Sequence, residues 1–351
     1  MEKRVTIKDI SQRTGVSPTT VTKALNGKNK ISEEKRQEIL RVAEEMGYKP
    51  NRFASALARN EVTIGIVIPK EPEVFFSSVI EGINAAIKQL EDERVRGIFC
   101  FLEENRGNLD EQLNELFLHN LNGLIISPGM FFKDNRILNR YLGKKKNIPI
   151  LYLLNEIQDL PAVGCVRMNG FAAGRMACEV LSMASGRKGT LAVMTEDNEL
   201  QVHRECISGF MQQAKECKVE VIEAGEMYDH YDVAYRLTKK LVEQHKDLAG
   251  IYVTSYKCTP VCNCLHDMGV TEQIAVVSQD LYPESIRRLN NKELCALIFQ
   301  DPYEQGRIAV KKICKLILEN EMVEDNIILP QLVLRSGLEY YIDKYCPSNA
   351  I

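Results

Sequence analysis

Short apolar runs alternate with longer segments of helical periodicity along most of this chain, from residue 62 onward. The runs span residues 62–69, 97–102, 124–127, 149–154, 164–168, 190–195, 219–224, 250–254, 275–279 and 296–300. Continuous apolar strands between helices are typical of parallel sheets that are buried on both faces. Because about 290 residues exceed the size of a typical single domain, the pattern predicts two α/β lobes with doubly wound parallel sheets within residues 62–346.

Residues 1–49 follow a different pattern, which predicts an all-α domain. Residues 4–25 read as two short helices that are broken at residues 15–18, and a third helix follows at residues 32–46. Three helices of this size have a small core but can form a domain. The arrangement is the outline of a helix-turn-helix.

Capping residues support these helix boundaries. Thr6 can cap the first helix together with Asp9, as in a capping box. Gly15 permits the tight turn that follows. Ser17 is a good N-cap for the second helix, and Pro18 takes its first position, where the missing N–H costs nothing.

The second helix has an apolar face and a polar face. Val21, Ala24 and Leu25 lie on the apolar face, which is expected to pack on the other helices. The opposite face presents Pro18, Thr19, Thr22, Lys23 and Asn26. Most polar helix faces are merely solvated, so this face alone does not separate a nucleic-acid-binding domain from a generic helical bundle.

The charge distribution favours nucleic acid as the partner of the N-terminal domain. Residues 1–60 hold 13 Lys+Arg against 7 Asp+Glu, whereas residues 61–351 hold 32 against 41. Basic charge is therefore concentrated at the N-terminus, although the whole chain has a net charge of −3. Cations of this kind supply the phosphate affinity that DNA binding needs.

Three blocks of this region resemble the N-terminus of the LacI family of bacterial transcription regulators. They are residues 5–10, 15–26 and 47–51, in the order and spacing of that family. The resemblance implies a helix-turn-helix DNA-binding domain at residues 1–49, a hinge helix and linker at residues 50–61, and a two-lobed, periplasmic-binding-protein-like effector-binding and dimerisation domain at residues 62–346. Its expected partner is a double-stranded DNA operator.

The resemblance assigns DNA contacts residue by residue. Pro18, Thr19 and Lys23 match the positions that read bases. Lys23 stands where the family usually has Arg, and lysine lacks the planar fork that grips guanine with two bonds, so softer base discrimination is expected there. The positions that hold the DNA backbone or buttress the helix are matched by Thr6, Ser17, Thr20, Thr22 and Asn26.

Residues 50–60 resemble the family's hinge helix, which is too short to be stable alone in water. In the family, two such helices pair across a dimer and push a leucine into the minor groove, and Leu57 matches that leucine. Ser55 stands where the family often has Arg. Without the resemblance, Leu57 would be interpreted as a linker or core leucine.

The resemblance also implies that the two lobes enclose a small ligand. The N-lobe is expected to span about residues 62–161 and to recover a segment near residues 295–320, with the remainder forming the C-lobe. Ligands of such sheets bind outside the carboxyl ends of the strands. The candidate effector-binding residues at these ends or in the following loops are Phe75, Phe76, Arg204, Lys257, Asp280 and Gln300.

Each candidate has a structural alternative. Asp280 matches the family's Asp that accepts hydrogen bonds from ligand hydroxyls, and Gln300 matches another frequent polar contact. The two phenylalanines can stack on an apolar ring face. Arg204 lies two residues before Cys206, where the family usually has Arg, and Lys257 stands where the family often has Asn. The alternatives are a helix cap for Asp280 and core packing for the phenylalanines.

Cysteine is abundant, with 11 residues. Cys258, Cys262, Cys264 and His266 lie close together, but their spacing does not fit paired Cys-x-x-Cys ligands, and thiols packed on a helix are the favoured interpretation. No metal and no cofactor are expected. An odd cysteine count without a secretory signal favours a reducing cytoplasm, and no apolar run approaches the ~20 residues that span a bilayer.

Three classes of function remain to be compared. A secreted sugar-binding receptor would explain the α/β lobes alone, and it would need a signal peptide. An enzyme is possible on this fold, but the sequence has no phosphate-binding Gly-rich fingerprint, no Gly-x-Ser-x-Gly elbow and no zincin motif. The favoured interpretation is a cytoplasmic homodimeric repressor, not an enzyme, whose operator affinity is modulated by a sugar or related polyol between the lobes.

Overall fold

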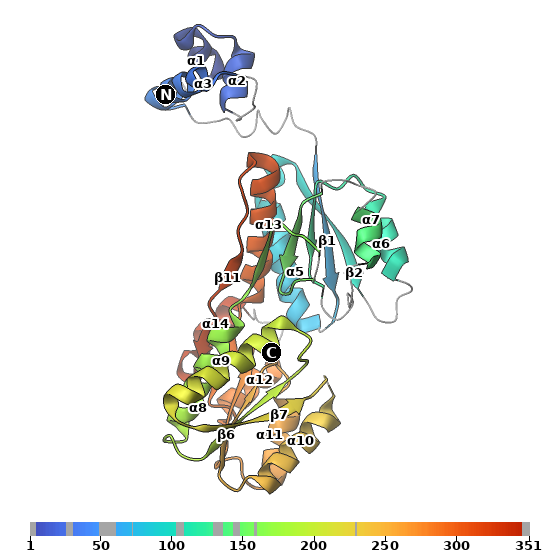
Figure 1. Ribbon diagram of the computed structural model, residues 1–351, viewed down its shortest axis with the longest axis vertical. Coiled ribbons are helices and arrows are strands. Elements are labelled where there is room, and N and C mark those ends of the chain that lie inside the picture. The colour runs from blue at the N-terminus through green and yellow to red at the C-terminus, as the bar shows by residue number, and fades with distance from the viewer. Residues whose placement is uncertain are drawn as a thin grey trace.

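The computed structural model describes residues 5–25, 31–48, 61–71, 73–102, 109–128, 136–142, 148–157, 160–228 and 230–345. At the N-terminus, α1 (Ile7–Thr14), α2 (Pro18–Leu25) and α3 (Glu33–Glu45) form a small helical domain (Figure 1). Its core is made by Ile10, Val21, Ala24, Ile39, Val42 and Ala43. These apolar residues recur at helical spacing, which is why the three helices close on one another. The predicted three-helix domain is confirmed.

The first α/β lobe, which we call the N-lobe, is built on a sheet in the order β11-β5-β4-β3-β1-β2. Its strands are β1 (Val62–Pro69), β2 (Val95–Leu102), β3 (Gly123–Ile126), β4 (Ile150–Leu153), β5 (Gly164–Met168) and β11 (Asn326–Ile328). Its helices are α5 (Glu73–Gln89), α6 (Leu109–Phe117), α7 (Arg136–Leu142) and α13 (Pro302–Glu319), with a 3-10 turn, η1 (Glu91–Glu93). Neighbouring strands pair in parallel.

The second α/β lobe, the C-lobe, repeats this plan with the order β12-β10-β9-β8-β6-β7. Its strands are β6 (Thr190–Thr195), β7 (Glu220–Glu226), β8 (Leu248–Val253), β9 (Ala275–Gln279), β10 (Ala296–Phe299) and β12 (Gln331–Val333). Its helices are α8 (Gly170–Ala184), α9 (Gln201–Cys217), α10 (Tyr231–Gln244), α11 (Thr259–Asp267), α12 (Pro283–Asn290) and α14 (Leu338–Tyr345), with η2 (Arg335–Gly337). β12 pairs antiparallel to β10 at the sheet edge.

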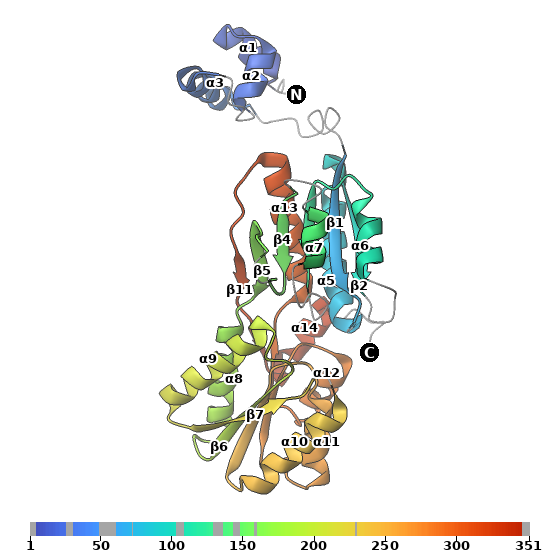
Figure 2. The same ribbon diagram turned by 45° about the vertical axis from the view of Figure 1, so that its right-hand side comes forward.

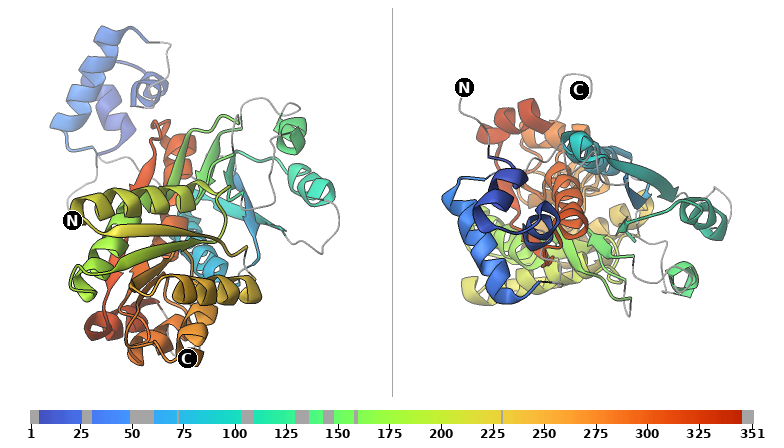
Figure 3. Two further views of the ribbon diagram at one scale, coloured as in Figure 1. Left: turned by 60° about the horizontal axis from the view of Figure 1, so that its bottom comes forward. Right: turned by 90° about the horizontal axis from the view of Figure 1, so that it is seen from above.

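Alternate residues of the inner strands face two different helix layers, which is why these strands are mostly apolar, whereas the edge strand β7 carries three glutamates. In β1, Ile64, Ile66 and Ile68 pack with α5 and α13, whereas Val67 packs with α6 and α7. The C-lobe sheet lies in the same way between two helix layers (Figure 2, Figure 3). One layer is made of α8 and α9, and the other of α10, α11 and α12. Parallel sheets that are covered on both faces, as predicted, are confirmed.

The chain passes between the lobes after β5, after β10 and between β11 and β12. The predicted N-lobe, residues 62–161 with 295–320, leaves out β5 and β11 and wrongly includes β10. β5 pairs with β4 and β11 in the N-lobe sheet, and β10 pairs with β9 in the C-lobe sheet, although α13 does pack on the N-lobe strands. β5 and β10 are short, mostly buried runs like the strands of either lobe, so their sequence carries no signal of which sheet they join.

Glycines bring one helix pair in each lobe into backbone contact. A Cβ at Gly82 of α5 would lie 1.9 Å from a carbonyl oxygen of α13, and one at Gly306 of α13 would lie 2.2 Å from a carbonyl oxygen of α5. In the C-lobe, Gly174 of α8 and Gly209 of α9 approach the partner helix in the same way, at 1.9 Å each. Each pair therefore packs closer than any residue with a Cβ would allow.

Candidate functional site

The first helix of the N-terminal domain is fixed by the predicted capping box. Asp9 Oδ2 accepts hydrogen bonds from the Thr6 N–H (2.7 Å) and from Thr6 Oγ1 (2.6 Å), and the Asp9 N–H lies 3.4 Å from Thr6 Oγ1. Gly15 has a φ of 69° and donates its N–H to Ser11, which ends α1. The turn between α1 and α2 is thus set by local bonds.

Helix α2 keeps an exposed outer face over a buried inner one. Val21 and Ala24 are buried against α1 and α3, whereas Pro18 and Thr19 are exposed and Lys23 is half-buried. The three residues that match base-reading positions therefore share one accessible face. A helix of this kind, with its N-terminal residues free, has the shape that enters a major groove.

The hydroxyls of α2 stabilise its first turn. Ser17 Oγ accepts a hydrogen bond from the Thr20 N–H (3.1 Å) and lies 2.8 Å from Thr20 Oγ1. Thr22 Oγ1 donates to the carbonyl four residues back (2.9 Å). Two further predicted DNA contacts, Asn26 and Leu57, lie outside the described residues, as does the predicted hinge at 50–60.

In the C-lobe, β9 and β10 end in a hydrogen-bonded pair of polar side chains. Asp280 is only 5% exposed, and its Oδ2 accepts a hydrogen bond from Gln300 Nε2 at 2.7 Å. The Gln300 N–H lies 3.5 Å from Asp280 Oδ1. Helix α12 begins after Tyr282, and the Tyr282 N–H donates a hydrogen bond to Ser285 Oγ. Ser285 therefore caps this helix. The Asp280 carboxylate does not cap it but accepts the hydrogen bond from Gln300.

Burial raises the pKa of Asp280 to about 7, although the hydrogen bonds from Gln300 oppose the rise. A carboxyl that gains and loses its proton near neutral pH can either accept a hydrogen bond from a ligand hydroxyl or donate one to it. Gln305, which is fully buried, donates its Nε2 to the backbone oxygen of Gln300 (2.9 Å) and so holds that residue in place.

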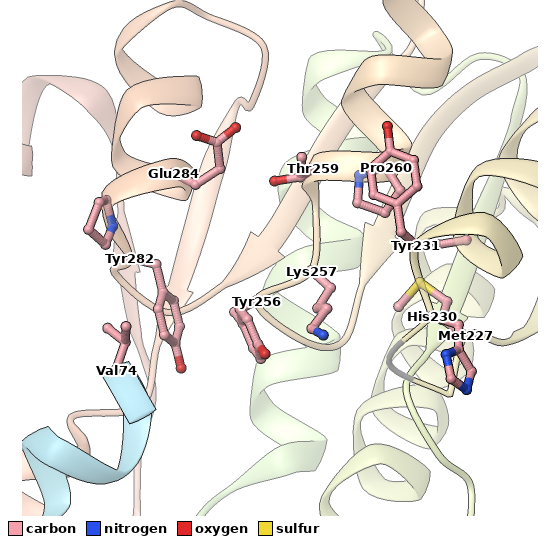
Figure 4. Close-up of a pocket in the computed structure, with 12 residues that line it drawn as sticks. Val74, Met227, His230, Tyr231, Tyr256, Lys257, Thr259, Pro260, Tyr282 and Glu284 are labelled. Carbon is pink, nitrogen blue, oxygen red and sulfur yellow. The ribbon is translucent and has the colours of Figure 1, made fainter. Parts of the chain in front are cut away.

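A pocket of about 380 Å³ opens at the same carboxyl edge of the C-lobe sheet (Figure 4). It is lined by the loops and first helical turns that follow β7, β8 and β9, and by Val74 of the N-lobe helix α5. The pocket therefore involves both lobes. Its position is the one expected for ligands of doubly wound sheets.

Two tyrosines form one wall of this pocket. The ring centroids of Tyr256 and Tyr282 are 4.5 Å apart with an interplanar angle of 30°, and Figure 4 shows the two rings next to each other. Tyr282 is 7% exposed, and its hydroxyl has no hydrogen-bond partner among the described residues. Buried tyrosine hydroxyls usually have a partner, so this one is available to a ligand.

Charged groups flank the tyrosines. Lys257 lines the pocket with its Nζ 5.3 Å from the Tyr256 ring centroid. Burial lowers the pKa of Lys257, and the nearby charge of Glu196 opposes that shift. Glu196 follows β6, and within the described ranges its buried Oε2 has no hydrogen-bond partner. The pocket thus presents a cation and two aromatic rings, and a carboxylate lies near enough to that cation to act on its pKa.

Of the six predicted effector contacts, Lys257 lines the pocket and the other five are not among its lining residues. Phe76 is 7% exposed in the N-lobe core, and Phe75 packs half-buried against the same core, with the two ring centroids 5.2 Å apart. Arg204 is exposed, and its guanidinium donates to the carbonyl oxygens of residues 198 and 199 (2.7 and 2.6 Å). It therefore holds the loop that precedes α9.

Sequence reasoning missed three residues at this edge. Tyr256 and Tyr282 each lie within three residues of a predicted strand and shortly before a proline that starts a helix, so the strand-end rule could have found them. His203 is buried with its Nδ1 2.9 Å from Thr254 Oγ1, and burial lowers its pKa. It carried no such signal because it lies inside α9.

The cysteine-rich segment lies on α11. Cys258, Cys262 and Cys264 are buried, whereas the side chain of His266 is 83% exposed on the same helix. In the part of the chain that the structure describes, no three His, Cys, Asp or Glu side chains are arranged to hold a metal ion. No helix in these ranges is long and apolar enough to cross a membrane.

A helix-turn-helix domain joined to two α/β lobes with a pocket at the strand ends defines a class of proteins, the ligand-binding transcription regulators with a periplasmic-binding-protein-like core. Residues 64–321 match the family model described as the periplasmic binding protein domain, and residues 6–51 match that of bacterial regulatory proteins, lacI family. The chain belongs to the LacI family of DNA-binding transcription regulators.

Named relatives agree with this assignment. The chain is 23% identical over 331 residues to catabolite control protein A of Priestia megaterium, covering 92% of this chain and 96% of that protein. It is 24% identical over 333 residues to the ribose operon repressor of Bacillus subtilis, covering 93% and 95%. The fold is similar to that of GanP, a glucose-galactose binding protein from Geobacillus stearothermophilus, with a TM-score of 0.69, 20% identity, and coverage of 80% of this chain and 99% of that one.

Proposed function

We propose that this protein is a homodimeric, cytoplasmic repressor whose affinity for its operator is changed by a sugar or related polyol bound between the lobes. The observation that carries the proposal is the Asp280–Gln300 pair, a buried carboxyl and amide at the carboxyl ends of adjacent strands. Such groups are the partners that ligand hydroxyls need. The names of two similar proteins, a ribose operon repressor and a glucose-galactose binding protein, support a sugar.

The proposed mechanism is a coupling free energy between the pocket and the DNA-binding face. Because Val74 of the N-lobe and the C-lobe loops line one pocket, a ligand there has different contacts in different arrangements of the lobes and favours one of them. In the proposal, the new arrangement of the N-lobes in a dimer repositions the segments at 50–60. These segments align the two helix-turn-helix domains on a pseudo-palindromic operator. Couplings of this kind are typically about 5- to 150-fold in affinity.

The DNA half of the proposal is tested by selecting binding sites from a random duplex library. Lys23→Ala should relax base preference at one position of each half-site and cost about 1–3 kcal/mol of discrimination. Lys35→Ala on α3 is the matched control, because it removes the same charge from an exposed position outside α2. It should weaken binding to all sequences alike. Unchanged selectivity of Lys23→Ala would contradict base reading by α2.

The effector half is tested by measuring operator affinity of the full-length protein while a panel of sugars, polyols and sugar phosphates is added. At least one compound should change the operator Kd by about fivefold or more and should also raise the melting temperature. Light scattering should give the mass of a dimer. A panel in which no compound changes either quantity would contradict a sugar effector.

A further inference from the structure

An ion pair joins the two lobes beside the crossing that follows β5. Arg167 is the second-last residue of β5 in the N-lobe, and Glu205 lies in the second turn of α9 in the C-lobe. Arg167 Nη1 donates a hydrogen bond to Glu205 Oε2 at 2.7 Å, and only 15% and 24% of the two side chains are exposed. Charge-assisted hydrogen bonds of this length are among the stronger polar contacts in proteins. The pair therefore stabilises the arrangement of the lobes described here.

Each member of the pair is fixed to its own lobe. Arg167 lies on a strand that is paired on both sides, with β4 and with β11. Helix α9 is joined to α8 by the glycine contacts described above, and Gln201 Nε2 donates to Glu205 Oε1 at 2.8 Å. Because a hydrogen bond needs a short distance and a nearly linear geometry, a rotation of one lobe against the other breaks the Arg167–Glu205 bond.

The backbone at this crossing packs directly against α9. A Cβ at Gly170, the first residue of α8, would lie 2.6 Å from the carbonyl oxygen of Val202 and 2.9 Å from Glu205 Cβ. Asn169, between β5 and α8, donates its N–H to the carbonyl oxygen of Ile328 at 2.8 Å, which ties this crossing to the end of β11. The ion pair is thus placed where two of the three connections between the lobes run side by side.

Arg167 has a second carboxylate within reach, and this one belongs to its own lobe. Glu156 follows β4, and its Oε1 lies 3.9 Å from Arg167 Nε. A largely buried cation that loses its partner is costly. Arg167 avoids that cost, because the Glu156 carboxylate can pair with it when Glu205 moves away. The guanidinium therefore has one acidic partner in each lobe.

We propose that Arg167 is a two-position switch between the lobes. Its pair with Glu205 stabilises the lobe arrangement described here, and its pair with Glu156 stabilises an arrangement in which α9 has moved away from β5. The inference rests on the proposed function, in which the lobe arrangement sets operator affinity. The three residues act as positioning residues, because they change the balance between two arrangements and are remote from the DNA-binding helix.

The test is the operator affinity of the full-length protein without added effector, measured on the duplex that the wild type selects from the random library. Glu205→Gln should change the operator Kd by about threefold or more, because it weakens one of two competing pairs. Glu156→Gln weakens the other pair, so it should change the Kd in the opposite direction or leave it unchanged. A change below threefold for Glu205→Gln, or changes in the same direction for both variants, would overturn the inference.

Glu216→Gln is the matched control. Glu216 accepts two hydrogen bonds from Arg175, at 2.9 and 2.7 Å, but this pair joins α8 to α9 within the C-lobe. Its loss should leave the operator Kd within about 1.5-fold of the wild type. Melting temperatures are measured in parallel. If Glu205 had only a structural role, Glu205→Gln would lower the melting temperature and leave the Kd unchanged.

The outcomes separate this inference from the proposed function. If the wild type selects an operator and Glu205→Gln binds it with the same affinity, the inference fails while the proposed function stands. If the wild type selects no DNA sequence from the library, both fail.

Discussion

Asp280 is a buried carboxyl whose ionisation the fold opposes. Its pKa is about 7 in the folded protein, against an ordinary value of 3.8, so between about pH 4 and 7 the unfolded chain releases a proton that the folded state keeps. The free energy of unfolding should therefore fall as pH rises through this window, by about 4 kcal/mol at about 1.4 kcal/mol per unit. Above pH 7 the loss is complete.

Asp280→Asn tests this linkage. Asn cannot ionise, tolerates the φ of 62° at this position and keeps an amide oxygen for Gln300. In denaturant titrations between pH 4 and 8, the variant should lose less stability with rising pH than the wild type and be the more stable protein at pH 8. The exposed Asp92→Asn serves as control. Parallel pH profiles for wild type and Asp280→Asn would show that Asp280 does not carry this dependence.

At the residue scale, the strand-end rule located Asp280, Gln300 and Lys257 at the carboxyl edge, but whether they bind the effector remains a prediction. The same rule selected Phe75 and Phe76 as effector contacts, whereas of these three neighbours it is Val74 that lines the pocket. Successive residues of a helix point about 100° apart, so a position near a helix start does not fix which side chain faces a ligand. That orientation is decided by how α5 packs on the N-lobe sheet.

At the element scale, the approach of α8 and α9 depends on Gly209. Gly209→Ala would place a methyl group 1.9 Å from a carbonyl oxygen of α8, and a backbone atom cannot rotate away as a side chain can. The variant should lose about 1–3 kcal/mol of unfolding free energy, despite the better helix propensity of Ala. The melting temperature of the purified protein measures this.

Gly337→Ala is the matched control for that substitution. A Cβ at this position would meet no atom within 4 Å. Its effect should stay within about 0.5 kcal/mol. Equal effects of the two substitutions would mean that the helix contact adjusts freely.

Strands were easier to predict than the sheets that they form. The runs at 62–69, 164–168, 190–195 and 275–279 have the bounds of β1, β5, β6 and β9. β11 and β12, of three residues each, were not predicted, because the apolar runs there, 327–329 and 332–334, are only three residues long and are separated by Pro330 and Gln331. Sheet membership depends on the path of the chain between the lobes, which local sequence does not encode.

At the scale of the whole molecule, each lobe contains a helix that follows a strand of the other lobe in the chain. α8 follows β5 of the N-lobe and packs on α9 of the C-lobe, whereas α13 follows β10 of the C-lobe and packs on α5 of the N-lobe. Neither lobe is one continuous segment, so we expect them to unfold together. Native-state hydrogen exchange should show α5 and α9 losing protection with the same denaturant dependence. Separate dependences for the two helices would contradict coupled unfolding.

The crossing after β10 also affects the order in which the protein can assemble during synthesis. α5 ends at residue 89 and its partner α13 at residue 319. At about 5–20 residues per second, the apolar face of α5 waits roughly 10–50 s for the helix that covers it. During that time the growing chain exposes an amphipathic helix beside an unfinished sheet, which is the kind of surface that chaperones bind and that aggregates at high expression. Its soluble yield should therefore depend on a lower growth temperature and on the supply of chaperones. Substitutions on the surface of the folded protein should matter less.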